Sequence, residues 1–244
     1  MKKTLTIIFV FLLLPAAAMA SEGHGPALDP VKIDLGDKAS LQRGARTFIN
    51  YCLSCHSAGY MRYNRMGRDL GISDELVKEN LLFAADKTGD LMKTVMPAED
   101  ARVWFGTAPP DLTLIARYRG PDWIYTYMRS FFRDESAPSG WNNKVFPHVA
   151  MPHVLYEWQG EQRAIMEKNG DGVEQITGFK IAKAGSMGET EYNAAMRDLA
   201  NFMVYLAEPA KLVRYEIGIY VIFFLIIFLG VAYLLKKEYW NDIH

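Results

Sequence analysis

The feature that most constrains this chain is the pentapeptide Cys52-Leu53-Ser54-Cys55-His56, which holds both cysteines of the 244-residue sequence. Two thiols on one helical turn can form thioether bonds with the two vinyl groups of one porphyrin, and the histidine that follows can bind the iron. The pattern therefore predicts one covalently attached haem c, with Cys52 and Cys55 as attachment points and His56 as the proximal iron ligand.

Two other uses of this cysteine pair compete with haem attachment. A redox-active C-x-x-C pair belongs in a thioredoxin-like βαβ context, which this segment lacks. A zinc site needs four ligands, and His148 with His153 could complete a Cys2His2 set. About ninety residues separate these histidines from the cysteines, which is unlike compact zinc modules. The haem hypothesis instead uses the adjacent His56.

The N-terminal segment, residues 1–20, is typical of a secretory signal peptide. Lys2 and Lys3 precede a short apolar run, and small residues follow up to Ala20, where we expect cleavage. The apolar run is too short to span a bilayer, and an uncleaved signal anchor is the alternative. Export of the N-terminus predicts that the following domain, residues 21–210, lies outside the cytoplasm.

A second apolar segment, residues 217–235, is nineteen residues long and carries no charge. At about 1.5 Å per residue it covers about 28 Å, close to the hydrocarbon thickness of a bilayer. We therefore expect a transmembrane anchor over residues 215–235 and a cytoplasmic tail over residues 236–244. Basic residues are balanced on the two sides of the anchor, so its expected orientation rests on the signal peptide.

The chain has 27 Lys and Arg residues against 28 Asp and Glu residues, and its basic residues form no run that would suit nucleic-acid binding.

Residues 41–51 predict a helix capped by Ser40 that leads into the cysteines, and Gly44 leaves room for a close helix crossing. A second amphipathic helix opens at Thr190 and stops at Pro209. The two helices predict a mainly α domain.

A haem that only transfers electrons needs a second axial ligand, because an open position invites ligand or peroxide chemistry. Met151 is the best candidate, because Pro147 and Pro152 stiffen the loop around it. Thioether with imidazole also raises the reduction potential relative to two imidazoles. His148 and His153 of the same loop remain alternatives. Weaker candidates lie at the N-terminus, too near the motif, in helices or outside rigid loops: His24, Met61, Met66, Met92, Met96, Met128, Met166, Met187, Met196 and Met203.

Four motifs in order resemble the cytochrome c1 family of the cytochrome bc1 complex. They are Gln42-Arg43-Gly44 before the haem motif, APPDLT at residues 108–113, the Met151 loop, and AEP at residues 207–209 before the anchor. The resemblance runs from about residue 41 to the end. It implies a mainly α, cytochrome c-like domain with loop and small β-hairpin insertions, plus one C-terminal transmembrane helix.

The resemblance also implies roles for individual residues. Met151 corresponds to the family's distal iron ligand, and Pro110 would wall the haem edge. The arginine that pairs with a haem propionate falls on Arg119, close to Arg117; a solvated surface arginine is the alternative for either. Trp123 takes the place of an aromatic residue that lines the haem, where many relatives carry Tyr.

The function implied by the resemblance is electron relay from the reduced Rieske iron–sulfur protein to a c-type cytochrome acceptor. Its implied partners are cytochrome b and the Rieske subunit, in a dimeric complex of the bacterial inner membrane, with the haem domain on the periplasmic side. The chain itself would hold no bond-making active site. The alternatives are an electron-donor subunit of a haem–copper oxidase and a haem enzyme such as a peroxidase.

Two regions follow the family pattern loosely. Residues 65–107 form an insertion in which we expect a helix near residues 74–85. Residues 157–189 predict a hairpin with a turn at residues 169–172, which lacks the acidic series of a calcium-binding loop. Acidic residues near the haem edge could steer a basic acceptor; the candidates are Glu99, Asp100, Asp134 and Glu135.

Overall fold

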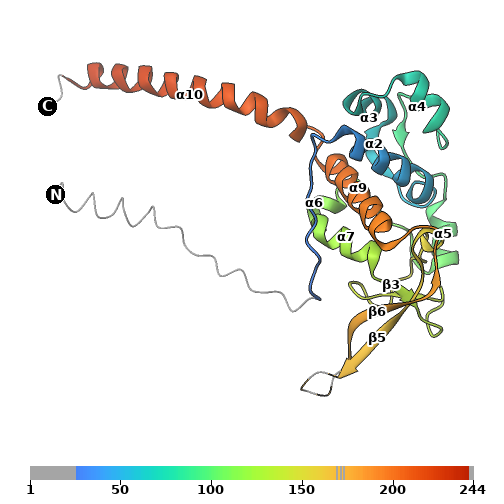
Figure 1. Cartoon of the computed structure of the whole chain (residues 1–244). Helices are drawn as coiled ribbons and strands as arrows, with labels where there is room; N and C mark the ends of the chain where they lie inside the picture. Colours follow the sequence, from blue (N-terminus) through green and yellow to red (C-terminus); the bar gives the residue numbers. More distant parts are fainter. Residues whose placement is uncertain (1–25, 169, 171, 173, 242–244) are drawn as a thin grey trace.

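The computed structural model describes residues 26–168, 170, 172 and 174–241, so the expected signal peptide and the candidate ligand His24 lie outside it. The described part is mainly helical, with short antiparallel strand pairs (Figure 1). Its elements are α2 (Lys38–Thr47), η1 (Phe48–Cys52), β1 (Ala58–Arg62), α3 (Tyr63–Leu70), α4 (Asp74–Asn80), β2 (Leu91–Met92), α5 (Ala98–Phe105), α6 (Ile115–Arg119), α7 (Pro121–Arg129), β3 (Phe131–Arg133), β4 (Trp141–Asn143), α8 (Tyr156–Gln159), β5 (Gly160–Lys168), β6 (Glu174–Ala184), α9 (Glu189–Ala207) and α10 (Lys211–Tyr239).

The core forms where α9 crosses α2 (Figure 1). Gly44 permits the crossing, because a Cβ at this position would lie 2.2 Å from the Asp198 carbonyl oxygen. The Asp198 carboxylate then accepts hydrogen bonds from the Ser40 hydroxyl at 2.7 Å and from Arg43 Nε at 2.6 Å. The close crossing that the sequence predicted is therefore confirmed, and a buried carboxylate reinforces it.

The helix that leads into the haem motif differs at both ends from its prediction. It begins earlier, because Asp37 is its N-cap and accepts a hydrogen bond from the Ser40 backbone N–H at 3.0 Å. Ser40, predicted as the cap, lies within the helix. At the other end the backbone continues through the π-helical turn η1 as far as Cys52. The Cys52 carbonyl then accepts from the backbone N–H groups of Cys55 and His56, at 3.1 and 2.8 Å. These bonds fold the motif into a tight turn.

Helix α7 forms a second side of the core and packs against α9. It follows Gly120, whose φ of 87° suits glycine, and it opens with Pro121, which needs no hydrogen-bond partner at that position. The Tyr192 hydroxyl of α9 donates to the Met128 carbonyl at 2.8 Å. This bond fixes α7 relative to α9 and therefore fixes the face that α7 turns inward.

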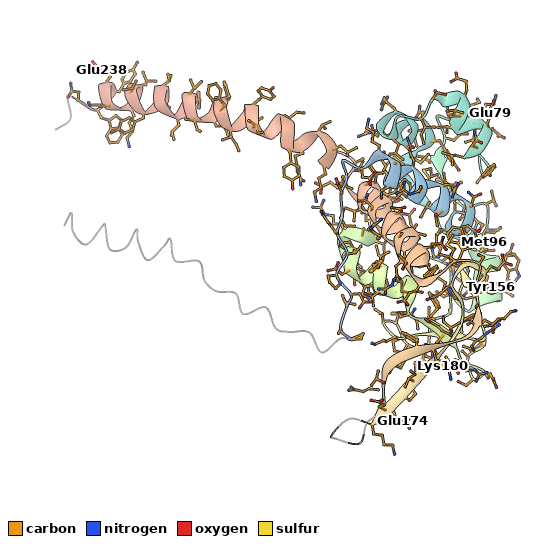
Figure 2. The ribbon with its side chains drawn as sticks, viewed as in Figure 1. Glu79, Met96, Tyr156, Glu174, Lys180 and Glu238 are labelled. Atoms are coloured by element: carbon orange, nitrogen blue, oxygen red, sulfur yellow. The ribbon has the colours of Figure 1, made fainter. Side chains whose placement is uncertain are left out.

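The two insertions agree with their predicted structures to different degrees. Helix α4 ends at Asn80, where the side-chain amide donates to the Leu76 carbonyl at 3.0 Å, so the helix predicted up to residue 85 was too long. The predicted hairpin is present as β5 paired antiparallel with β6. It extends from the body of the domain, and Lys180 and Glu174 lie along it towards its tip (Figure 2). The predicted turn includes positions 169 and 171, which lie outside the described residues.

Helix α10 contains the whole apolar segment that the sequence predicted as an anchor. It extends away from the domain, and Glu238 lies near its far end (Figures 1 and 2). Its apolar side chains are exposed along its length, and its mean hydropathy reaches 2.7 over 18 residues. At about 1.5 Å per residue its 29 residues extend about 43 Å, enough to cross a bilayer with a margin on each side.

Candidate functional site

A cavity of 310 Å³ lies beside the motif turn, and its lining is predominantly apolar. That volume is within the range typical of small-molecule and cofactor sites. The motif turn, the loop before α6, helix α7, the Met151 loop and helix α9 all contribute to its wall. The lining includes each residue that the sequence proposed for cofactor binding: Cys52, Cys55, His56, Pro110, Arg119, Trp123 and Met151.

His56 is held in one tautomer by the loop that contains Pro110. Its Nδ1 lies 2.8 Å from the Pro110 carbonyl oxygen. Because a carbonyl can only accept a hydrogen bond, Nδ1 carries the proton, and the unprotonated Nε2 has a free lone pair with which to bind a metal. Burial lowers the pKa of His56, while the Pro110 carbonyl and the charge of Asp111 partly oppose that shift. A neutral imidazole with one nitrogen fixed by a carbonyl is the usual form of a metal-binding histidine.

The cysteines are free, and Cys52 is buried. Burial raises the pKa of the Cys52 thiol to about 12, and the neighbouring Cys55 adds to this shift. Reactive C-x-x-C pairs have lowered thiol pKa values and lie in electropositive surroundings. The environment of Cys52 is therefore unlike that of a catalytic dithiol, and it is compatible with a thiol that is consumed by a covalent bond.

The Pro110 loop is tied directly to the chain that follows the motif. Asp111 Oδ2 accepts from the Gly59 backbone N–H at 2.8 Å, and its Oδ1 accepts from the backbone N–H and the hydroxyl of Thr113 at 2.8 and 2.5 Å. Asp111 thereby holds the Pro110 loop against the segment that follows the haem motif. The hydrogen bond between His56 and the Pro110 carbonyl lies where these two segments meet. An aspartate in the APPDLT motif gives no sign of this role in the sequence alone.

Met151 lines the cavity from its loop, and its sulfur is hydrogen-bonded. The Tyr127 hydroxyl of α7 donates to Met151 Sδ at 3.4 Å. Burial raises the pKa of the Tyr127 hydroxyl, so it stays protonated and able to donate. The Tyr127 ring is stacked on Trp123, with centroids 4.8 Å apart and an interplanar angle of 11°. Nothing in the sequence pattern distinguishes Tyr127 from an ordinary core residue.

The two histidines of the Met151 loop lie elsewhere. His148 is exposed and has a φ of 59°. His153 is buried between aromatic rings, stacked on Phe131 at 4.9 Å and edge-on to Trp141 at 5.1 Å. Burial lowers the pKa of His153 to about 4. Neither imidazole lines the cavity, so the structure does not bring them to the cysteines as a zinc site would require.

Two further methionines also line the cavity, Met128 from α7 and Met203 from α9. Both are almost fully buried among core side chains, and both lie on the inward faces of helices. A helical apolar stripe predicts burial but does not say which buried residue meets a cavity. This is why the sequence could not separate these two methionines from ordinary core residues.

Arg119 ends α6 at the rim of the cavity, where its side chain is exposed. Its guanidinium carbon lies 5.1 Å from the centroid of the Trp123 ring, close enough for a cation–π interaction. Arg117, the other arginine considered, is not among the lining residues. The cavity therefore combines an apolar interior with a cation at its rim, which suits a ring with apolar faces and anionic substituents.

The residues present fit a haem c. Two thiols and the free Nε2 of His56 lie together, a thioether comes from a separate loop, and the remaining lining is mostly apolar. This donor set is that of a covalently attached haem with imidazole and thioether available to the iron.

Comparisons with known proteins agree with the chemistry of the site. A model of the "Cytochrome C1 family" matches residues 33–175 and 183–243. A cytochrome c1 from Allochromatium vinosum is 50% identical over 240 residues, covering 98% of each chain. A protein of Nitrosomonas europaea named "Ammonia monooxygenase gamma subunit" is 48% identical over 98% of this chain and 97% of its own. A "Cytochrome b/c1" of Bradyrhizobium diazoefficiens is 27% identical, covering 85% of this chain and 34% of its own.

The family match spans most of the chain, and the 50% identical relative is matched over nearly its full length. These matches do not favour the alternative of a donor subunit for a haem–copper oxidase. The chain therefore belongs to the cytochrome c1 family, the membrane-anchored haem c proteins that relay electrons in the cytochrome bc1 complex alongside cytochrome b and the Rieske subunit.

Proposed function

We propose that this chain performs its electron relay with His56 and Met151 as the axial ligands of a haem c attached through Cys52 and Cys55. The observation that supports this most directly is that all four side chains line one apolar cavity, with Nδ1 of His56 occupied by the Pro110 carbonyl. A bound haem c supplies one-electron exchange at its iron.

The protein's own groups prepare the site for that exchange. The Pro110 carbonyl fixes the imidazole ring, so little rearrangement accompanies a change of charge. The apolar lining excludes water from the cavity, and Arg119 at the rim offers a charge partner for a propionate. With His56 and Met151 both available to hold the iron, a bound haem would favour electron transfer over oxygen chemistry, including the kind that the name of the Nitrosomonas relative suggests.

We also propose that the haem domain lies on the periplasmic side of a bacterial inner membrane, with α10 as a single-pass anchor. Residues 1–20 are the export signal in this proposal, and residues 236–244 are the cytoplasmic tail. Protease added to intact spheroplasts should then cleave the domain, whereas a protected domain would contradict this orientation.

The proposed acceptor is a soluble or tethered c-type cytochrome, in a dimeric complex. Of the four acidic candidates, Glu99 and Asp100 are exposed in the first turn of α5, and Phe105 at the end of the same helix lines the cavity. Glu135 is instead paired with Arg163 of the β5–β6 hairpin, and the Asp134 carboxylate accepts hydrogen bonds from Ser136 and Asn142. Glu99 and Asp100 are therefore better placed to steer a basic acceptor. If the rate of electron transfer to the acceptor depends on salt but does not change when these two residues are replaced, this assignment is wrong.

Replacement of Met151 by histidine tests the ligand assignment. Met151→His should keep the covalent haem but lower its midpoint potential by about 100 mV or more, because axial ligands tune haem potentials over roughly 0.8 V. Redox titration of the complex in membranes measures the change. Met203→Leu is the matched control, since it removes another thioether from the cavity lining. An unchanged potential in Met151→His, with a marked fall in Met203→Leu, would move the assignment to Met203.

A further inference from the structure

The hydroxyl of Tyr127 is a polar group at an otherwise apolar part of the cavity wall. It lies 3.4 Å from Met151 Sδ and donates its proton to that sulfur. A thioether sulfur carries two lone pairs and is a weak acceptor. One lone pair can therefore bind a metal while the other accepts the hydrogen bond.

The position of this hydroxyl is set by packing on more than one side of the ring. Trp123 stacks on one face of the Tyr127 ring, and the ring meets Phe131 edge-on, with centroids 4.9 Å apart at 71°. Phe131 is fully buried, and it is stacked in turn on His153, two residues after Met151 in the same loop. The aromatic cluster thus joins α7 to the Met151 loop, and it holds donor and acceptor in register.

We propose that Tyr127 is a positioning residue that holds the Met151 sulfur towards the iron and raises the reduction potential through its hydrogen bond. This inference rests on the proposed function, because it takes Met151 as the distal ligand. Hydrogen bonding draws electron density from the sulfur and makes it a weaker donor. The oxidised iron carries the greater positive charge and loses more from a weaker donor than the reduced iron does. The hydrogen bond therefore favours the reduced state.

Packing alone does not account for the hydroxyl. Phenylalanine would keep the stack on Trp123 and the edge contact with Phe131, and it would bring no polar atom into the apolar cavity wall. A polar atom removed from water costs free energy unless it finds a partner, and the partner here is the proposed iron ligand. The contact thus has the form of an outer-shell interaction that orients and tunes a metal ligand.

The test compares Tyr127→Phe with Tyr125→Phe in the full-length chain assembled in its membrane complex. Each change removes one hydroxyl from the same helix, but Tyr125 does not line the cavity and instead lies under Arg129, 4.4 Å from its guanidinium carbon. Tyr127→Phe should lower the midpoint potential, so that the ratio of reduced to oxidised protein at a fixed ambient potential falls two- to tenfold. At 59 mV per tenfold for one electron, this is about 18 to 59 mV. Tyr125→Phe should leave the ratio unchanged.

A third variant, Met151→Leu, tests the assignment of Met151 as iron ligand separately from the role of Tyr127. It should abolish the near-infrared charge-transfer band of thioether-ligated ferric haem. If Met151→Leu keeps that band, Met151 is not the ligand. The ligand assignment in the proposed function and the inference about Tyr127 are then both wrong. If Met151→Leu loses the band but Tyr127→Phe has an unchanged or raised potential, only the role of Tyr127 is overturned. A lowered potential in Tyr127→Phe, with the band retained or weakened, supports the proposal.

Discussion

At the scale of single residues, Asp111 is the side chain on which the geometry of the motif most depends. Its carboxylate receives three hydrogen bonds, from Gly59 on one segment and from Thr113 on the other. The adjacent Pro110 carbonyl fixes the His56 ring. A carboxylate is suited to this position, because two oxygens can accept several bonds at once.

We predict that Asp111→Ala lowers the free energy of unfolding by about 1 kcal/mol, since it removes charge-assisted hydrogen bonds at a partly solvated site. Denaturant unfolding of the purified protein, followed by haem absorbance, measures the loss. Glu135→Ala is the control, because Glu135 makes a long, exposed ion pair with Arg163, at 3.5 Å. Equal stability of the two variants would show that Asp111 does not hold the loop.

The sequence predicts those site residues whose chemical type carries a signal. The cysteine pair with His56 is such a signal, and a methionine in a proline-stiffened loop is a weaker one. Tyr127 has none, because a tyrosine on an amphipathic helix is an ordinary core residue until the fold brings its hydroxyl to a sulfur. Contacts of this kind depend on helix placement and cannot be obtained from spacing along one chain.

At the scale of elements, the crossing of α2 and α9 positions the motif turn against the rest of the domain. Gly44 lies at the closest point, where a Cβ would be 2.2 Å from the Asp198 carbonyl and 2.6 Å from Phe202 Cβ. A backbone atom cannot move aside as a flexible side chain can. The two helices would therefore have to separate to accommodate any larger residue.

Gly44→Ala should lower the free energy of unfolding by about 1–3 kcal/mol, the usual cost of overpacking a core. The direction of this change distinguishes a crowded position from an open one, because alanine in an open helix position raises the free energy of unfolding by up to about 1 kcal/mol relative to glycine. Thermal unfolding monitored by circular dichroism gives the comparison. Gly89→Ala is the control, since a Cβ there meets no heavy atom within 4 Å. The close crossing would be refuted by a Gly44→Ala protein as stable as the control.

The elements also show where sequence rules reach their limit. Apolar periodicity predicted α2 and α9, but both Asp37 and Ser40 are good caps, and the structure uses Asp37 while Ser40 bonds to Asp198. Periodicity cannot separate two such caps, because the buried carboxylate that recruits Ser40 comes from a distant helix. Helix α4 ends at Asn80, where the next residue, Leu81, leaves helical backbone geometry with a φ of −134°.

At the scale of the whole molecule, a compact haem domain is joined through the short segment after Ala207 to one long apolar helix (Figure 1). Among the described residues, α10 has the length and composition to cross a membrane. This division was predictable, because nineteen uncharged residues can be buried by lipid far more easily than by a domain of this size. The anchor ties the haem domain to the membrane.

Every role proposed for the site depends on the covalent bond between porphyrin and chain. Extraction with acidified acetone, followed by mass spectrometry of the denatured protein, tests this bond directly. We expect the colour to stay with the precipitated chain, whose mass should exceed that of its amino acids by one haem. Haem that passes into the solvent, leaving a chain with the mass of its amino acids alone, would contradict the attachment through Cys52 and Cys55.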